Sequence, residues 1–477
     1  MNYLNQLTIK QALSGLEQKE FTCQELVQDC LQAIDKHDPK LKAYLTVEPE
    51  QALAAAQKAD QNRASGQAGF LEGIPLAIKD NFSVQGMRTT ASSKMLDDYV
   101  PPFNATVIAR LRAAGTIVLG KTNLDAFAHG SSTETSDYFT TLNPWDTSRL
   151  PGGSSGGSAA AVSADLCLGA MGSETAGSVR GPASWCGCTG FKPTYGRVSR
   201  YGVVAMASST DSPGPLTKTI EDAALILQII AGQDEHDSTS SPLAVGDYLA
   251  ACAKEIKGVK IGLPKQYFLP EISDDIKQAV MDAVREFEKM GASVQEVDCL
   301  DPKYSIAVYT ILQRAEVASN LSRLDGNRYG NNRSFMGDEA VNRIMSGTYV
   351  LAAEFQDQYY RKGKKVRQMI IDNFASIFEQ VDVLMSPTFP MLAPRVGASQ
   401  ETAIFGELMD VLVEPSSLAG LPGLGIPCGF AQPKDGDKKL PIGMQIIGSH
   451  FSEELLFSLG HAYQQATSWH LEKPMLS

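Results

Sequence analysis

The 477-residue sequence predicts an α/β fold in which helices cover a β-sheet. Two short apolar runs punctuated by Gly and Pro, at 73–82 and 116–124, lie on either side of the helical stretch VIARLRAAG at 107–115. The same pattern of a strand followed by a helix recurs where the apolar run 258–264 precedes a helical segment at 274–292. Alternating strands and helices of this kind are typical of α/β units, so we expect a sheet with helices packed on it.

Elements outside this rhythm are also predicted. Thr22 is a plausible N-cap for the amphipathic helical segment 22–38. SVQEVD at 293–298 reads as a strand, the chain becomes helical again over 338–380, and VDVLMSPT at 381–388 reads as a further strand. GQDEHDSTSSP, rich in Ser and Asp, indicates either a surface loop or a boundary. We expect one domain.

Composition and charge restrict the class of function. Acidic residues outnumber basic ones by 12 and the pI is about 5.1, so the protein's field repels phosphate backbones, and any nucleic acid is held mainly by a partner. The sequence lacks the apolar core of a secretory signal and any run near the ~18 apolar residues of a membrane span. The 8 cysteines form no CxxC pair, as is typical of reduced thiols, and we therefore expect a cytoplasmic protein. Cys186 and Cys188 have no nearby His, so we expect no metal site. We also expect no contact with a membrane.

The stretch 145–215 contains the chemically informative motifs. PGGSSGGS at 151–158 would be typical of a flexible linker, but it runs into an apolar Ala-rich segment and a second small-residue cluster, MGSETAGS, follows. A phosphate-binding loop is excluded because GK[ST] is missing. The G-x-S-x-G pattern of a nucleophile elbow is present, but TSRLPGG is not the strand that an elbow follows, and His450, His461 and His470 have no helpful motif around them.

Three motifs, in this order along the chain, resemble those of the amidase-signature family: GIPLAIKDNF, GGSSGGSAA and GSETAGSVRGPA. The resemblance implies a large mixed sheet with helices on both faces. It also implies a single amidase domain over 1–477, with an N-terminal helical segment to about 65, a signature core at about 66–215, and a C-terminal helical and substrate-pocket part at about 216–477.

The same resemblance assigns the catalytic roles. Ser178 is the expected nucleophile, Ser154 a bridging serine after a cis peptide bond, and Lys79 the base. Such a base must be neutral, so its pKa must fall from about 10.4 toward 7, and burial in an apolar strand favours this. The backbone N–H groups of the small-residue run Thr175, Ala176, Gly177 and Ser178 are the expected oxyanion hole.

Longer stretches resemble one branch of the family, the glutaminase subunits of tRNA-dependent amidotransferases. These are KPTYGRVSRYGVVAMASSTDSPGPLT, AEVASNLSRLDGNRYG, NRIMSGTYVL, SSLAGLPGLGIPCG and LPIGMQIIG. The resemblance implies hydrolysis of L-glutamine, with ammonia passed to the B subunit of such an enzyme, which uses ATP and Mg and binds most of the tRNA. It implies the C subunit as a further partner and no cofactor in this chain.

A free glutamine needs a partner for its carboxylate and one for its ammonium. The resemblance implies Arg343 for the carboxylate and Asp410 for the ammonium, with Tyr309 and His129 lining the pocket. The sequence departs from the family pattern at Ala176, where glycine is usual, at His129, where methionine is expected, and after Gly330, where the chain is shorter. The alternative function is a stand-alone small-molecule amidase with the same triad.

Overall fold

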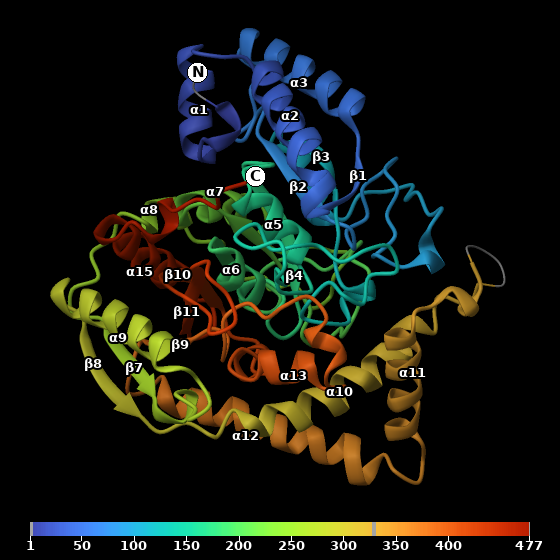
Figure 1. The fold of residues 1–477 in the computed structure, drawn as a ribbon, viewed down its shortest axis with the longest axis vertical. Coiled ribbons are helices and arrows are strands. Elements are labelled where there is room, and N and C mark those ends of the chain that lie inside the picture. The colour runs from blue at the N-terminus through green and yellow to red at the C-terminus, as the bar shows by residue number, and fades with distance from the viewer. Residues whose placement is uncertain (1–2, 327–330, 477) are drawn as a thin grey trace.

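The computed structural model describes residues 3–326 and 331–476. Its centre is one 11-stranded sheet with the strand order β1-β3-β2-β4-β6-β5-β10-β11-β9-β7-β8 (Figure 1). The strands are β1 Tyr44–Val47, β2 Pro75–Lys79, β3 Ile117–Thr122, β4 Gly169–Glu174, β5 Thr189–Lys192, β6 Ser212–Thr217, β7 Lys260–Pro264, β8 Ser293–Val297, β9 Val383–Pro387, β10 Gly423–Ala431 and β11 Leu440–Gly448.

The sheet is mixed, as expected. β2 runs parallel to β3 and β4, and β7 runs parallel to β8 and β9. The neighbours between these two groups are antiparallel. The five runs predicted to be strands contain β2, β3, β7, β8 and β9. The α/β prediction is therefore confirmed.

Helices cover both faces of the sheet. Gly169 and Gly172 of β4 point to opposite faces because side-chain direction alternates along a strand. A side chain at Gly169 would meet Ile9 and Ile226, whereas one at Gly172 would meet Ser155. The helices are α1 Ile9–Gln18, α2 Cys23–Leu41, α3 Pro49–Ala64, α4 Thr106–Ala113, α5 Gly156–Ser163, α6 Arg180–Cys186, α7 Ile220–Ile230, α8 Tyr248–Ala251, α9 Asp274–Lys289, α10 Lys303–Leu321, α11 Asp338–Leu351, α12 Lys362–Ile377, α13 Phe405–Asp410, α14 Glu414–Leu418 and α15 Glu453–Ala466.

The predicted cap of α2 is present. Thr22 Oγ1 accepts a hydrogen bond from Glu25 N at 3.1 Å, and Glu25 Oε2 accepts one from Thr22 N at 2.7 Å, which makes a capping box. The apolar stripe of this helix is buried. Its burial attaches the N-terminal helices to the edge of the sheet formed by β1–β3 (Figure 1).

The helical stretch predicted over 338–380 consists of two helices. α11 ends at Leu351, and a π-helical turn at Asp357–Arg361 leads into α12. Both helices pack on α10 at the side of the molecule shown lowest in Figure 1. The Ser- and Asp-rich stretch 232–242 forms a loop between α7 and α8. Within the described residues, no helix is long and apolar enough to cross a membrane.

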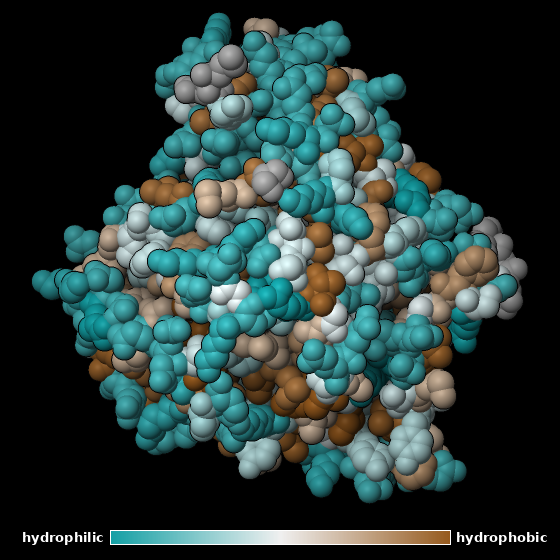
Figure 2. Space-filling model, in the orientation of Figure 1, coloured by the Kyte–Doolittle hydropathy of each residue, from teal (hydrophilic) through white to brown (hydrophobic). Residues whose placement is uncertain are grey.

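The surface in Figure 2 is mainly hydrophilic, and apolar side chains gather low on this face, over α13 and α10. Ile404 and Leu408, at α13, are 42% and 39% exposed. The same short helix buries Asp410 on its other side. One surface of α13 therefore faces solvent while the other faces the candidate site.

Candidate active site

The three predicted catalytic residues lie near the carboxyl ends of two neighbouring strands. β2 and β4 are parallel, so these ends meet at the same edge of the sheet. Lys79 is the last residue of β2, and the chain leaves β4 through Ser178 before it enters α6. Ser154 lies just before α5, which packs on β4 and α6. The fold therefore brings all three motifs to one place.

The Lys79 amine is fully buried. Its Nζ lies 2.8 Å from Ser154 Oγ, 3.0 Å from the carbonyl oxygen of Ser173 and 3.0 Å from Ser173 Oγ. Burial lowers the pKa of Lys79 from 10.5 to about 7, although three nearby carboxylates oppose the change. A neutral amine at this position can accept a proton from Ser154 near neutral pH.

Ser154 and Ser178 are brought together by their loops. The peptide bond between Gly153 and Ser154 is cis, as expected. Ser155 N donates a hydrogen bond to the carbonyl oxygen of Ser178 at 3.1 Å, and this links the two loops. Within the part of the chain that the structure describes, the Ser178 hydroxyl makes no hydrogen bond, and the residue is 5% exposed. It is therefore free to meet a substrate.

The run Thr175–Ser178 has the backbone groups expected of an anion site. No N–H of this run donates a hydrogen bond to another of the described residues. Ala176, which replaces a glycine of the family pattern, has an ordinary negative φ, so its methyl group is compatible with the loop. Gly177 cannot be replaced in this way, because a methyl group there would lie 2.4 Å from Val413 Cγ2.

A buried ion pair that the sequence reasoning missed fixes this loop. Glu174 Oε2 accepts hydrogen bonds from the backbone N–H groups of Val179 and Arg180, both at 3.0 Å. Arg180 Nε donates to Glu174 Oε1 at 2.9 Å, and Arg180 Nη2 donates to the carbonyl oxygen of Ala176 at 3.1 Å. Both residues belong to the GSETAGSVR motif, but the sequence alone does not distinguish a buried ion pair from an exposed one.

The predicted substrate residues come from four other segments and are buried. Arg343 of α11 and Asp410 of α13 are 6% and 5% exposed, although a polar helix face would ordinarily be solvated. Asp410 Oδ1 lies against the oxyanion run, since a methyl group at Gly177 would lie 2.5 Å from it. The Arg343 charge acts on both Tyr309 and His129. The structure therefore groups these four predicted residues beside the triad.

Burial sets the protonation of this group. It raises the pKa of Asp410 well above the ordinary range, against the hydrogen bond that Ser131 Oγ donates to Asp410 Oδ2 at 2.9 Å. It lowers the pKa of His129 well below 6.5, and Arg343 lowers it further. His129 is therefore neutral.

Several polar atoms in this region have no hydrogen-bond partner among the described residues. They include Asp410 Oδ1 and both ring nitrogens of His129. Two residues that the sequence reasoning missed belong with them: Glu414 Oε1, four residues after Asp410, and Gln313 Nε2, one turn after Tyr309 on α10. Unpaired buried donors and acceptors are costly, so such a group is typical of a site that a polar ligand completes. The expected shortening between Gly330 and Arg343 stays a prediction; the described residues of this stretch, from 331 on, form a 3-10 turn at Arg333–Phe335 and the start of α11.

The amidase family profile matches residues 25–457 of the chain. This chain belongs to the amidase family. Among curated amidase relatives, the A subunit of glutamyl-tRNA(Gln) amidotransferase from Desulfatibacillum aliphaticivorans is 46% identical, with 99% of this chain and 100% of that protein covered. The protein of the same name from Methylobacillus flagellatus is 45% identical, with 98% of each covered.

Solved amidase structures agree with this assignment. The crystal structure of the glutamyl-tRNA(Gln) amidotransferase A subunit from Thermotoga maritima is 38% identical, with a TM-score of 0.84 over 99% of this chain and 98% of that one. The peptide amidase of Stenotrophomonas maltophilia is 28% identical, with a TM-score of 0.84 over 98% of each chain. The family resemblance and the amidase-signature fold predicted from the sequence are both confirmed.

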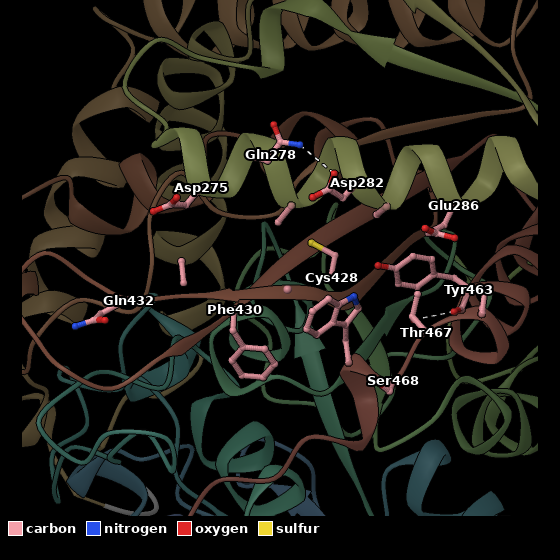
Figure 3. A pocket seen from close by; sticks show the side chains of 16 residues that line it. Asp275, Gln278, Asp282, Glu286, Cys428, Phe430, Gln432, Tyr463, Thr467 and Ser468 are labelled. Atoms are coloured by element: carbon pink, nitrogen blue, oxygen red, sulfur yellow. Dashed lines mark hydrogen bonds between the residues drawn. The ribbon is translucent and has the colours of Figure 1, made fainter.

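A separate cavity of about 700 Å³ lies between α9 and β10 (Figure 3). Acidic side chains of α9, among them Asp275, Asp282 and Glu286, line one side, and Phe430 and Tyr463 line the other. Asp282 accepts a hydrogen bond from Gln278 at 3.0 Å. No residue of the amidase triad or of the group around Asp410 lines this cavity.

Proposed function

We propose that this amidase is the glutaminase subunit of a tRNA-dependent amidotransferase. It hydrolyses the side-chain amide of L-glutamine and passes ammonia to a partner subunit, which uses ATP and Mg to convert Glu-tRNA(Gln) to Gln-tRNA(Gln). The observation that carries the proposal is the burial of an arginine and an acid, Arg343 and Asp410, in the group beside the triad. Asp410 Oδ1 lies against the Ser178 loop without a partner among the described residues, and Arg343 Nε donates to Glu339 Oε1 at 2.6 Å. A free amino acid needs both charges, and a neutral amide needs neither. The relatives' names, over nearly the full length, support the same reading.

In the proposed mechanism, Ser178 attacks the amide carbon of glutamine. Its proton passes to Ser154, while the Ser154 proton passes to neutral Lys79 over the 2.8 Å contact. Neutral Lys79 has two N–H donors and one lone pair. Its two N–H groups can donate to the carbonyl oxygen and the Oγ of Ser173, and the lone pair is then directed to Ser154. The proton then returns to the leaving nitrogen, ammonia departs, and water hydrolyses the acyl-enzyme.

The oxyanion that forms in this step needs donors. We propose the backbone N–H groups of the run Thr175–Ser178, because they are unpaired within the described chain and lie at the nucleophile. The Glu174–Arg180 pair supports this role by holding both ends of the loop. Preorganised donors stabilise the developing charge without having to reorganise during the reaction.

Substrate orientation is assigned to the group beside the triad. Arg343 would bind the α-carboxylate, Asp410 the α-ammonium, and Tyr309 and His129 would line the remaining wall. His129 is an unsuitable base, because neither ring nitrogen has a carboxylate or serine partner among the described residues. A Ser-His-Asp mechanism is therefore not favoured.

The finer assignments for the complex follow from the same proposal. The partners would be the B and C subunits of the amidotransferase, with tRNA bound mainly by the B subunit and with no cofactor in this chain. The net charge of −12 suits a protein that does not itself hold tRNA. A cytoplasmic location and a single domain over 1–477, divided near 65 and 215, remain predictions.

Ammonia release from glutamine, measured with and without the partner subunits, tests the proposal. We expect glutamine hydrolysis, and we expect Arg343→Ala to raise the KM for glutamine at least tenfold while leaving turnover of a neutral aliphatic amide unchanged. Arg343→Lys is the matched control that keeps the charge but loses the planar donor pair. If the wild-type protein hydrolyses aliphatic or aryl amides but not glutamine, the chain is a stand-alone amidase instead.

A further inference from the structure

Glu414 is a buried acid for which the mechanism above has no use. It begins α14 and has no exposed surface. Its Oε1 has no partner among the described residues, and its Oε2 lies 3.0 Å from Ser305 Oγ. The nearest acid in the chain, Asp410, also has one carboxyl oxygen unpaired. Two unpaired acidic oxygens therefore lie in one buried region.

We propose that Glu414 is a second acceptor for the α-ammonium group of the substrate, beside Asp410, and that it selects amides carrying a free α-amino group. The inference rests on the proposed glutaminase activity and adds a specificity-determining residue to it.

The hydrogen bonds of Ser305 identify which oxygen of Glu414 is the acceptor. Ser305 Oγ lies 2.6 Å from the carbonyl oxygen of Pro302 and 3.0 Å from Glu414 Oε2. Ser305 has a single hydroxyl hydrogen, and a carbonyl oxygen can only accept, so the shorter contact needs that hydrogen. In the structure Ser305 Oγ also donates at the longer contact, so its one hydrogen is shared between two acceptors. In the proposed state Glu414 Oε2 carries a proton, which removes this competition and leaves the unpaired Oε1 as a carbonyl acceptor.

The electrostatics of the site agree with this state. Burial raises the pKa of Glu414 well above the ordinary range, and Asp410 raises it further, whereas Arg343 opposes the rise. Glu407, the third buried acid nearby, is already paired, because Arg314 Nη2 donates to its Oε1 at 3.0 Å. Glu407 is therefore not free to bind a ligand in the way that Glu414 is.

An α-ammonium group has three N–H donors and needs more than one acceptor when it is buried. Asp410 Oδ1 and Glu414 Oε1 offer two, with one negative charge between them once Asp410 ionises on meeting the ammonium. The Tyr309 side chain, on the same face of α10 as Ser305, lies within electrostatic range of both acids and can supply a third oxygen. An amide without the amino group leaves these acceptors unpaired, and such sites reject the incomplete analogue strongly.

The experiment compares glutamine with glutaramic acid, which is glutamine without its α-amino group, on the full-length protein with its partner subunits. Glu414→Leu removes the acceptor. We expect it to raise the KM for glutamine at least tenfold, with kcat within about threefold, and to change kcat/KM for glutaramic acid by less than about threefold. Glu414→Gln keeps a carbonyl oxygen and can donate to Ser305, so its KM for glutamine should stay within about threefold of the wild-type value.

Glu407→Gln is the matched control and should change both substrates alike. Three results would each overturn the inference. The first is an equal loss of kcat/KM on both substrates in Glu414→Leu, and the second is an unchanged KM for glutamine in that variant. The third is a KM for glutamine in Glu414→Gln as high as in Glu414→Leu. If the wild-type enzyme hydrolyses glutamine, none of these three results contradicts the proposed glutaminase function. A wild-type protein that does not hydrolyse glutamine would instead overturn the proposed function and this inference together.

Discussion

The protonation of Lys79 predicts the pH dependence of the enzyme. Burial lowers its pKa to about 7, and only the neutral amine can act as a base. Above this pKa the amine is neutral and active, and below it the amine is charged and inactive. The value of kcat/KM should therefore reach half its maximum near pH 7 and fall about tenfold for each pH unit below that, so that about one hundredth remains at pH 5.

The assay is ammonia release from glutamine at concentrations well below KM, between pH 5 and 9, after confirming that the protein stays folded over that range. His129→Met separates Lys79 from histidine: since burial lowers the pKa of His129 well below 6.5, this variant should keep the same acidic limb. Lys79→Arg stays charged at every pH and should lose activity at least ~10³-fold throughout. A flat wild-type profile down to pH 5, or a kcat/KM that is still rising about tenfold per pH unit at pH 9, would refute the assignment of Lys79 as the base.

Other substitutions test the nucleophile, the loop and the ion pair. Ser178→Ala should abolish both turnover and labelling by a serine-reactive phosphonate, and labelling that persists in this variant would move the nucleophile elsewhere. Gly177→Ala should lower the free energy of unfolding by about 1–3 kcal/mol, measured by urea denaturation, and should remove most activity, because a methyl group has no room there; wild-type activity would contradict the packing. Arg180→Met should lower the free energy of unfolding by about 3–5 kcal/mol in the same measurement, because it leaves the buried Glu174 carboxylate without its positive partner. A decrease of less than about 1 kcal/mol in the free energy of unfolding would contradict a buried Glu174–Arg180 ion pair.

The fold class was accessible from the sequence because strands and helices carry local signals. Apolar runs bounded by Gly and Pro marked β2, β3, β7, β8 and β9, and Thr22 marked the start of α2. The order of strands was not accessible, since β5 and β10 are far apart in the chain and pair through contacts that no local pattern encodes. The break between α11 and α12 was missed for a similar reason, because the helical composition continues through it.

By itself, the sequence determined the motifs of the site: Lys79, Ser154 and Ser178 stand in patterns specific enough to indicate the family. Only the tertiary structure decided how these groups meet and in what environment. The low pKa of Lys79 comes from its burial, and Glu414 meets its hydrogen-bond partner Ser305, a residue 109 positions away, only in the folded chain. Burial and hydrogen-bond geometry depend on neighbours that are distant in the chain, and composition and spacing do not specify them.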